Sequence, residues 1–475
     1  MKKLAIAFLL LLDVAFSGIS QEQVLKPSVD ERTELLGVVF RLAGAQEYVN
    51  NNLLEYSGDI DQYFKAFIDH PMIKYARQIR GTNGISYDAV MNMAVHISIT
   101  DSIRFKENLS GKSLDKRWGT EIPEKFLDLL NQFYAETKFN AFFTDHSTIR
   151  SVAENNFNAI ISQVDFPWFQ QYYGGTPRGG FNLIISLTNG GGNYGVKVLY
   201  GNGQEDIYAI IGSWQQDNLG QPVYSNSITP TIIHEYNHSF CNPLIDEYST
   251  QMEAQAGKMY NLVSGKLRQQ AYGTPKTMLY EILVRACVIR YQQNHGFTGD
   301  QIGRLIIAEQ NRGFLWIGQL VDLLSVYEKE RSSYAALLDF MPEIVKLQNS
   351  LDAKRLTKKF DKHCARIIST SIKNGSLAVD PSINQIVVRF DRPMNTGSHG
   401  STYGKRGKEL FPEIPKDRTA RWNKETKKEW ILPVSLKPET EYSISFPANF
   451  FMAENLYPLR ETLFLDFKTG KKLGN

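Results

Sequence analysis

Two histidines and a glutamate in one short segment could hold and use a metal ion. Residues 231–240 read TIIHEYNHSF, which places His234 and His238 four positions apart with Glu235 directly after the first histidine. On a helix, side chains four residues apart lie one above the other, so both imidazoles would point to the same side. Glu235 would face a zinc-bound water and serve as general base. The segment therefore predicts a catalytic zinc site.

A catalytic zinc site needs a third protein ligand and one position open to water. The metzincin pattern, with a third histidine six residues after His238, is excluded because Leu244 stands there. Glu281 is the best candidate, since it lies in the middle of MLYEILVRACVIRY, a segment that is apolar on nearly every face. A carboxylate buried there must be paired or metal-bound. The alternative is an ion pair with Arg285, which could also support a zinc-bound Glu281.

The same residues carry a resemblance to known metallopeptidases. The HEYNH segment, followed after 42 intervening residues by Glu281, resembles the gluzincin pattern of thermolysin-like enzymes. The resemblance implies that His234, His238 and Glu281 bind Zn²⁺. Thermolysin-like enzymes have an aspartate four residues after the glutamate ligand, where this chain has Arg285. The residue that orients a ligand histidine is therefore not assigned by the pattern.

A second resemblance covers about residues 30–350. The segments ERTELLGVVFRLAGAQEY, HEYNHSFCNPLID and YEILVRA resemble an uncharacterised family of secreted bacterial proteins, a domain of unknown function suspected of peptidase activity. Together the two resemblances imply a zincin-like fold over residues 21–350 and a peptide or protein substrate. They leave open which residue supports the ligands or stabilises an oxyanion, with Arg285, Asp246 and Tyr291 as candidates.

The alternative function belongs to another class. A secreted binding protein could keep zinc as a structural or vestigial element, with a C-terminal module mediating attachment. The presence of Glu235 favours the hydrolase, because a purely structural site has no use for a base beside the metal.

Composition and charge restrict the remaining possibilities. The chain has 475 residues, 42% hydrophobic and 22% charged, which is typical of a globular protein of two or three domains. The net charge is only +3 and no nucleic-acid-binding motif is present, so no nucleic-acid partner is expected. Three cysteines are too few for a disulfide framework in an exported protein, and at least one must be free.

The first twenty residues predict export. MKKLAIAFLLLLDVAFSGIS combines a basic start, an apolar run and small residues near its end, as secretory signals do. Cleavage is expected before Gln21 or, alternatively, after Ser17. No later stretch reaches the roughly 18 apolar residues that a transmembrane helix needs. The protein is expected in the periplasm or outside the cell.

Hydrophobic periodicity predicts the elements that position the site. Residues 30–165 are expected to be helical, residues 166–214 to form strands, and residues 229–350 to return to helices. The NGGGNYG segment, residues 189–195, predicts a hairpin connection. Thr229 and Pro230 predict the start of the HEYNH helix, and Asn242-Pro243 predicts its end after about twelve residues.

The last quarter of the chain has a different pattern. Residues 351–364 carry a cluster of basic residues and are expected to be a linker. Residues 365–475 show short alternating segments with frequent Pro, Gly and Asn, which predict a small antiparallel sandwich. The segments LAVDPSINQIVVRFDRPMN and LKPETEYSISFP resemble the bacterial immunoglobulin-like domain. The expected fold is thus α+β, a mainly helical zincin-like domain with a small mixed sheet and a C-terminal all-β sandwich.

Overall fold

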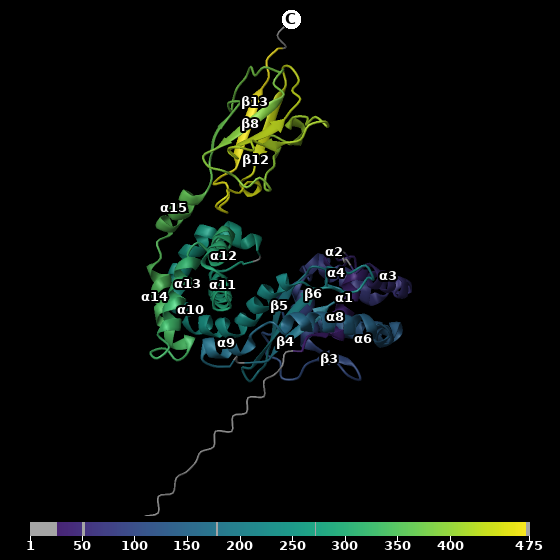
Figure 1. The fold of residues 1–475 in the computed structure, drawn as a ribbon. Coiled ribbons are helices and arrows are strands. Elements are labelled where there is room, and N and C mark those ends of the chain that lie inside the picture. Colours follow the sequence, from purple (N-terminus) through teal and green to yellow (C-terminus); the bar gives the residue numbers. More distant parts are fainter. Residues whose placement is uncertain (1–25, 50–52, 177–178, 271, 472–475) are drawn as a thin grey trace, which may run out of the picture. The chain divides into compact units, whose positions relative to one another are not determined.

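The structure is a computed structural model that describes residues 26–49, 53–176, 179–270 and 272–471. The expected export signal lies outside these residues. The chain divides into two compact units, Met1–Val164 with Arg178–Thr229, and Asp165–Pro177 with Pro230–Asn475. The described residues are rich in helix and contain several small sheets, so the fold is mixed α+β (Figure 1). Among them, no helix combines the length and apolar character needed to cross a bilayer.

The first unit contains a four-stranded sheet in the order β1-β4-β6-β5. Strands β1, β4 and β6 are parallel, while β5 runs antiparallel to β6. The central strands β4 and β6 are almost continuously buried, as strands covered on both faces usually are. The strands span Ser28–Val29 (β1), Phe181–Ser186 (β4), Tyr194–Leu199 (β5) and Glu205–Gly212 (β6).

The glycine-rich segment 189–195 does not close a hairpin, contrary to the prediction. It leads from β4 to β5, which are separated in the sheet by β6. The hairpin is formed instead by β5 and β6, which pair antiparallel around the turn at residues 200–204. The turn residues predict a loop here correctly. They do not predict which strands pair with each other, because pairing is decided by contacts between residues distant in sequence.

Helices make up most of the rest of the first unit. They bury a continuous set of aromatic and aliphatic side chains, and a short hairpin of β2 (Ile97–Ile99) and β3 (Ile103–Phe105) interrupts them. The helices are α1 (Glu31–Leu42), α2 (Gln46–Val49), α3 (Leu54–Tyr63), α4 (Pro71–Asn83), α5 (Asp88–His96), α6 (Ile122–Thr137), α7 (Phe139–Asp145) and α8 (Ser147–Ile161).

The second unit begins with a helix that the sequence reading assigned to strands. Residues Phe166–Tyr173 form α9, and the Asp165 carboxylate accepts a hydrogen bond from the Trp168 amide at 3.2 Å as N-cap. Pro167 occupies the first turn, where its missing N–H is tolerated. Asp-Phe-Pro is therefore a helix start, and the strand prediction for these residues is wrong because the cap and the proline begin a helix here.

The HEYNH helix is much longer than predicted. Helix α10 runs from Thr229 to Gln269 and contains Pro243. A proline inside a helix removes one backbone hydrogen bond and costs about 3 kcal/mol. The helix continues because residues beyond the proline, including Ile245, Met252 and Met259, are buried in the core of this unit. Burial outweighs the local stop signal.

Five further helices follow α10 in the chain. Helix α11 (Pro275–Asn294) begins at the Thr274 cap and carries Glu281, which makes it the second helix of the candidate site. The others are α12 (Gly299–Arg312), α13 (Ile317–Lys329), α14 (Leu337–Ser350) and α15 (Ala353–His363). Helix α15 occupies the segment expected to link the two domains.

The C-terminal region forms two small sheets that share one hydrophobic cluster. All strand pairs within them are antiparallel, as the alternating pattern predicts. One sheet has the order β10-β11-β8-β7 and the other β13-β12-β9. The strands are β7 (Ile367–Thr370), β8 (Gln385–Phe390), β9 (Thr402–Tyr403), β10 (Arg421–Trp422), β11 (Glu429–Pro433), β12 (Glu441–Phe446) and β13 (Leu463–Lys468).

Candidate metal centre

Three side chains from two helices of the second unit meet at one point. The Nε2 atoms of His234 and His238 on α10 lie 3.2 Å apart. Glu281 on α11 places Oε2 at 3.5 Å from Nε2 of His234 and Oε1 at 3.6 Å from Nε2 of His238. One ligand atom from each residue lies within 4.8 Å of the other two. The structure thus brings together the three residues expected to bind zinc.

These separations match the geometry of a small tetrahedral ion. With zinc–nitrogen and zinc–oxygen distances of about 2.0–2.1 Å, two ligand atoms of a tetrahedron lie about 3.4 Å apart. The nitrogen–nitrogen separation of 3.2 Å is close to that value, as are the shortest separations from each imidazole to the carboxylate, 3.5 Å to Oε2 and 3.6 Å to Oε1. Two imidazoles and a carboxylate are also the ligand types that zinc prefers, and three ligands leave the fourth position open.

Burial of this cluster leaves one carboxylate oxygen without a hydrogen bond. Glu281 is only 6% exposed, and its Oε2 atom is buried without a hydrogen-bond partner. Burial of His234, together with the nearby charges of His238 and Arg285, holds the pKa of the His234 imidazole well below its usual value. A neutral imidazole has a lone pair to offer, so the donor set fits a divalent cation.

Asn242 fixes the orientation of one imidazole, and the sequence reading missed it. Its Oδ1 atom lies 3.0 Å from Nδ1 of His238, one helical turn away. An Nδ1–H that donates to this oxygen leaves Nε2 with its lone pair directed at the cluster. The four-residue spacing from His238 to Asn242 was a usable signal, because the side chains of such pairs meet on a helix.

Arg285 pairs with Glu281 and contacts two further residues. Its Nη2 atom lies 3.2 Å from Oε2 of Glu281 and donates to the Tyr272 hydroxyl at 2.8 Å. Its Nη1 atom donates to Glu309 of α12 at 2.9 Å. Glu309 also pairs with Arg312 through Oε1 at 2.8 Å, so the two carboxylates share two guanidinium groups. Burial, with Glu281 nearby, raises the pKa of the Tyr272 hydroxyl to about 12.

Glu235 is half-buried beside this cluster. Burial raises the pKa of its carboxyl, the Glu281 charge raises it further, and the charges of His238 and Arg285 lower it. A carboxylate whose pKa is raised towards neutrality is a stronger base than an exposed one. The position and the direction of the pKa shift both suit a general base.

Asp246 and Tyr291, two of the predicted supporting residues, have contacts outside the three-residue cluster. Asp246 lies 2.5 Å from Nζ of Lys276 and accepts a hydrogen bond from Tyr280, while Asn242 makes the contact that orients His238. Tyr291 accepts a hydrogen bond from the Asp165 amide at 2.8 Å. It lies ten residues after Glu281 on the same helix, which corresponds to about 15 Å along the axis. The contacts of Asp246 with Lys276 and of Tyr291 with the Asp165 amide cannot be predicted from spacing along the chain.

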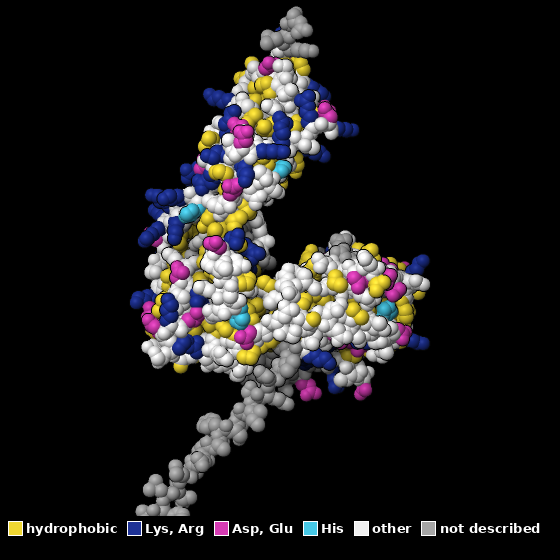
Figure 2. Space-filling model, in the orientation of Figure 1, with side chains coloured by type: hydrophobic (Ala, Val, Ile, Leu, Met, Phe, Trp, Pro, Cys, Tyr) yellow, Lys and Arg dark blue, Asp and Glu magenta, His cyan; other side chains and the backbone are white. Residues whose placement is uncertain are grey.

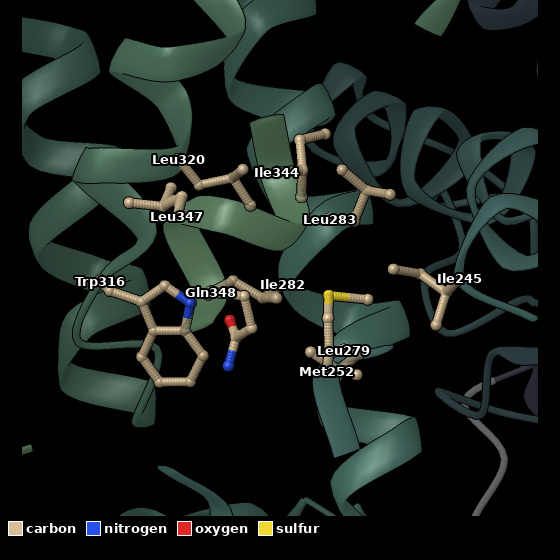
Figure 3. Close-up of a pocket in the computed structure, with 10 residues that line it drawn as sticks. All are labelled: Ile245, Met252, Leu279, Ile282, Leu283, Trp316, Leu320, Ile344, Leu347 and Gln348. Atoms are coloured by element: carbon tan, nitrogen blue, oxygen red, sulfur yellow. The ribbon is translucent and has the colours of Figure 1, made fainter. Parts of the chain in front are cut away.

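An apolar wall holds the two ligand-bearing helices in place. Leu279, Ile282 and Leu283 flank Glu281 on α11 and face Ile245 of α10, with side chains of α13 and α14 completing the wall (Figure 3). The gap between them has a volume of about 10 Å³, which is too small for any ligand larger than one water. This region is therefore packing, which fixes the backbone on which Glu281 is carried.

Comparison with solved structures gives only remote similarities. CopC from Methylosinus trichosporium OB3b is 12% identical, with 23% of this chain and 98% of that chain covered and a TM-score of 0.19. Two structures of the surface layer protein SbsC are 12% and 14% identical, with TM-scores of 0.18. They cover 55% and 51% of this chain, and the matches span about a third of each SbsC chain. Such scores carry no argument about fold or function.

No curated protein matches the chain. A family model does match, and it covers residues 28–347, which include the three candidate ligands, Glu235 and Asn242. The chain therefore belongs to the family described as Domain of unknown function (DUF4932).

Proposed function

We propose that the chain is an exported zinc-dependent hydrolase, a metallopeptidase of gluzincin type that acts on a peptide or protein substrate. His234, His238 and Glu281 would hold Zn²⁺, and Glu235 would be the general base. The observation that carries this proposal is the convergence of two imidazole nitrogens and one carboxylate at 3.2, 3.5 and 3.6 Å.

When bound, zinc would supply Lewis-acid polarisation of the scissile carbonyl and make the attacking water more acidic. Glu235 takes the proton from that water and transfers it to the leaving amine. Its raised pKa suits both steps, because the same carboxyl must accept and then release a proton. Asn242 keeps the His238 ring in one orientation, and Arg285 holds Glu281.

Three finer assignments belong to the same proposal. The mixed sheet of the first unit and the helices of the second would form a zincin-like fold, supported by the HEYNH helix that follows the sheet in the chain. The C-terminal sheets would form an immunoglobulin-like module, supported by their antiparallel pairing and common core. Export to the periplasm or the exterior rests on the character of the first twenty residues.

Metal content and hydrolysis, measured on the same protein, test the proposal. The mature chain is expected to contain about one zinc per molecule and to cleave members of a peptide library. His234→Ala should lose the zinc, whereas His399→Ala, a change at an exposed histidine of the C-terminal region, should keep it. Glu235→Gln should keep the zinc and lose hydrolysis, since the amide preserves the shape but cannot take the proton.

The same measurements separate the alternative function. A protein that retains zinc through His234 but cleaves nothing, with or without Glu235, would be a binding protein with a structural site. If neither the unmodified chain nor the Glu235 variant contained zinc, the proposed metal centre would be wrong.

A further inference from the structure

Helix α15 carries an uncompensated stripe of positive charge. Lys354, Arg355, Lys358, Lys359 and Lys362 are all exposed. At 100° per residue, these five positions fall within an arc of about 140° on one side of the helix. Figure 2 shows Lys and Arg side chains gathered over this helix. We call these five residues the α15 stripe.

The opposite side of the helix is used for packing. Leu356 is buried, and the Phe360 ring contacts the Tyr457 ring with centroids 5.5 Å apart. The Nζ atom of Lys266, on α10, lies 5.0 Å from the centre of the same Phe360 ring. The helix is therefore fixed on the second unit by its apolar side, and only its charged side remains free for a partner.

No acidic side chain neutralises the stripe within the described part of the chain. The α15 stripe forms no ion pair there, and Asp361, the acid inside this helix, pairs with Arg460 at 3.0 Å. The Asp352 carboxylate accepts from the Arg355 amide as N-cap. Like charges four residues apart, such as Lys354 with Lys358, destabilise a helix by a few tenths of a kcal/mol each. A surface helix that only needed solubility would interleave several acids, whereas the single acid of α15, Asp361, pairs with a residue outside the helix.

Positive charge is concentrated in the last quarter of the chain, which includes α15. Residues 351–475 contain 23 Lys and Arg against 14 Asp and Glu, a formal net charge of +9, although the full chain has only +3. The remaining 350 residues are therefore net acidic. A long-range potential of this kind attracts a polyanion to the basic end of the sequence and disfavours its binding elsewhere.

We propose that the α15 stripe is a docking surface for a linear acidic polysaccharide. From Lys354 to Lys362 the helix rises about 12 Å, with successive charged rows about 5.4 Å apart, so a strand bearing a regular series of anionic groups can follow it. Four of the five cations are lysines, which act as point charges and accept sulfate, phosphate or carboxylate alike.

Two other polyanions fit the stripe less well. A membrane surface normally recruits an amphipathic helix by burying its apolar side, and the apolar side of α15 is already packed against protein. Single-stranded nucleic acid is normally held by aromatic side chains on which bases stack, and the Phe360 ring of α15 is already packed against Tyr457 and Lys266. This inference does not depend on the metal centre.

The test uses the mature full-length chain and three probes, namely heparin, vesicles with phosphatidylglycerol, and single-stranded DNA. Heparin is expected to bind most tightly, with an affinity that falls as salt rises. If the five cations of the stripe neutralise five anionic groups of heparin, a plot of the logarithm of the association constant against the logarithm of the salt concentration should have a slope of about −3.5. This value follows the behaviour of single-stranded polyanions. The triple variant K354E/K358E/K362E is expected to bind heparin at least tenfold more weakly, with a shallower slope.

A matched control separates the stripe from net charge. K416E/K424E/K437E reverses three exposed lysines of the C-terminal region and changes the net charge by the same amount. It should bind heparin within about twofold of the unmodified chain. K354Q/K358Q/K362Q, which adds no new charge, should lose affinity in the same direction as the reversal, and thermal unfolding checks that each variant is folded.

Three results overturn the proposal. Equal weakening by the two charge-reversal variants would show that net charge alone is responsible. Tighter binding of vesicles or DNA than of heparin would assign the stripe to a different partner. Absence of heparin binding near physiological salt would show that the α15 stripe is not a docking surface for an acidic polysaccharide.

Discussion

Two buried glutamates, one in each unit, show opposite solutions to the same problem. Glu34 on α1 is fully buried, and each of its oxygens is satisfied by neutral donors. Leu187 N–H and Ser186 Oγ donate to Oε1 at 2.7 and 3.1 Å, and Tyr56 donates to Oε2 at 3.0 Å. Glu281 has a buried Oε2 without a hydrogen bond, which lies 3.2 Å from the Arg285 guanidinium, and its carboxylate faces two imidazoles. Glu34 is thus a structural carboxylate, whereas the surroundings of Glu281 suit the cation ligand of the proposed zinc site.

The largest expected effect is on zinc affinity, when the proposed ligand Glu281 is changed. Glu281→Gln should lower zinc affinity by more than about 100-fold, since even the groups that orient ligands contribute about 10- to 100-fold. Glu34→Gln, the same chemical change at the other buried glutamate, should leave zinc affinity unchanged. Competition with a chelating dye measures both. Equal zinc affinity of the two variants would contradict the assignment of Glu281.

For the free energy of unfolding, the larger effect is expected at Glu34. Glu34→Ala leaves the Leu187 amide and the hydroxyls of Ser186 and Tyr56 without their acceptor, and each orphaned buried group costs about 1–3 kcal/mol. The free energy of unfolding of the first unit should fall by about 3 kcal/mol, while the zinc content stays the same. Urea unfolding followed by circular dichroism measures the change, and a loss of zinc in this variant would show that the two glutamates are coupled.

Glu34 also predicts a pH dependence. Burial raises the pKa of its carboxyl to about 7 from the ordinary value of 4.5. Between these values the folded chain holds a proton that the unfolded chain has released, so the stability is greatest below pH 4.5 and falls as pH rises to 7. The loss amounts to at most about 3 kcal/mol. Glu34→Gln should lack this component, and parallel pH dependence of the two proteins would show that Glu34 does not titrate in this range.

The smallest effect is expected from the residue that orients His238. Asn242→Ala removes the oxygen that lies 3.0 Å from Nδ1, so the imidazole can rotate and its tautomer is no longer fixed. Zinc affinity should fall about tenfold. Asn242→Asp, which keeps an acceptor, should retain or increase the affinity. A decrease of the same size in both variants would mean that Asn242 acts only through packing.

The sequence predicted the ligand cluster better than the architecture around it. The four-residue spacing of the histidines and the apolar surroundings of Glu281 each have a local physical cause, and the structure places these residues together. The contacts of Asp246 and Tyr291 depend on neighbours far away in the chain, and spacing could not reveal them.

The errors in the fold have equally specific reasons. Pro243 was read as a helix end, but burial of later residues such as Ile245 carries α10 onward. The start of α9 was missed although Asp165 and Pro167 signal it. The order of the parallel strands in the first sheet depends on long-range pairing, which no local pattern encodes.

The contact between Arg285 and Glu309 has a consequence for the dynamics of α12. Glu309 lies on this helix and holds the guanidinium that in turn holds Glu281, so a local opening of α12 leaves Arg285 with only Glu281 and the Tyr272 hydroxyl among the polar partners named above. Metal affinity and the closed state of α12 are then thermodynamically linked, and the linkage is reciprocal. Addition of zinc should slow amide hydrogen exchange in a helix that contributes no ligand.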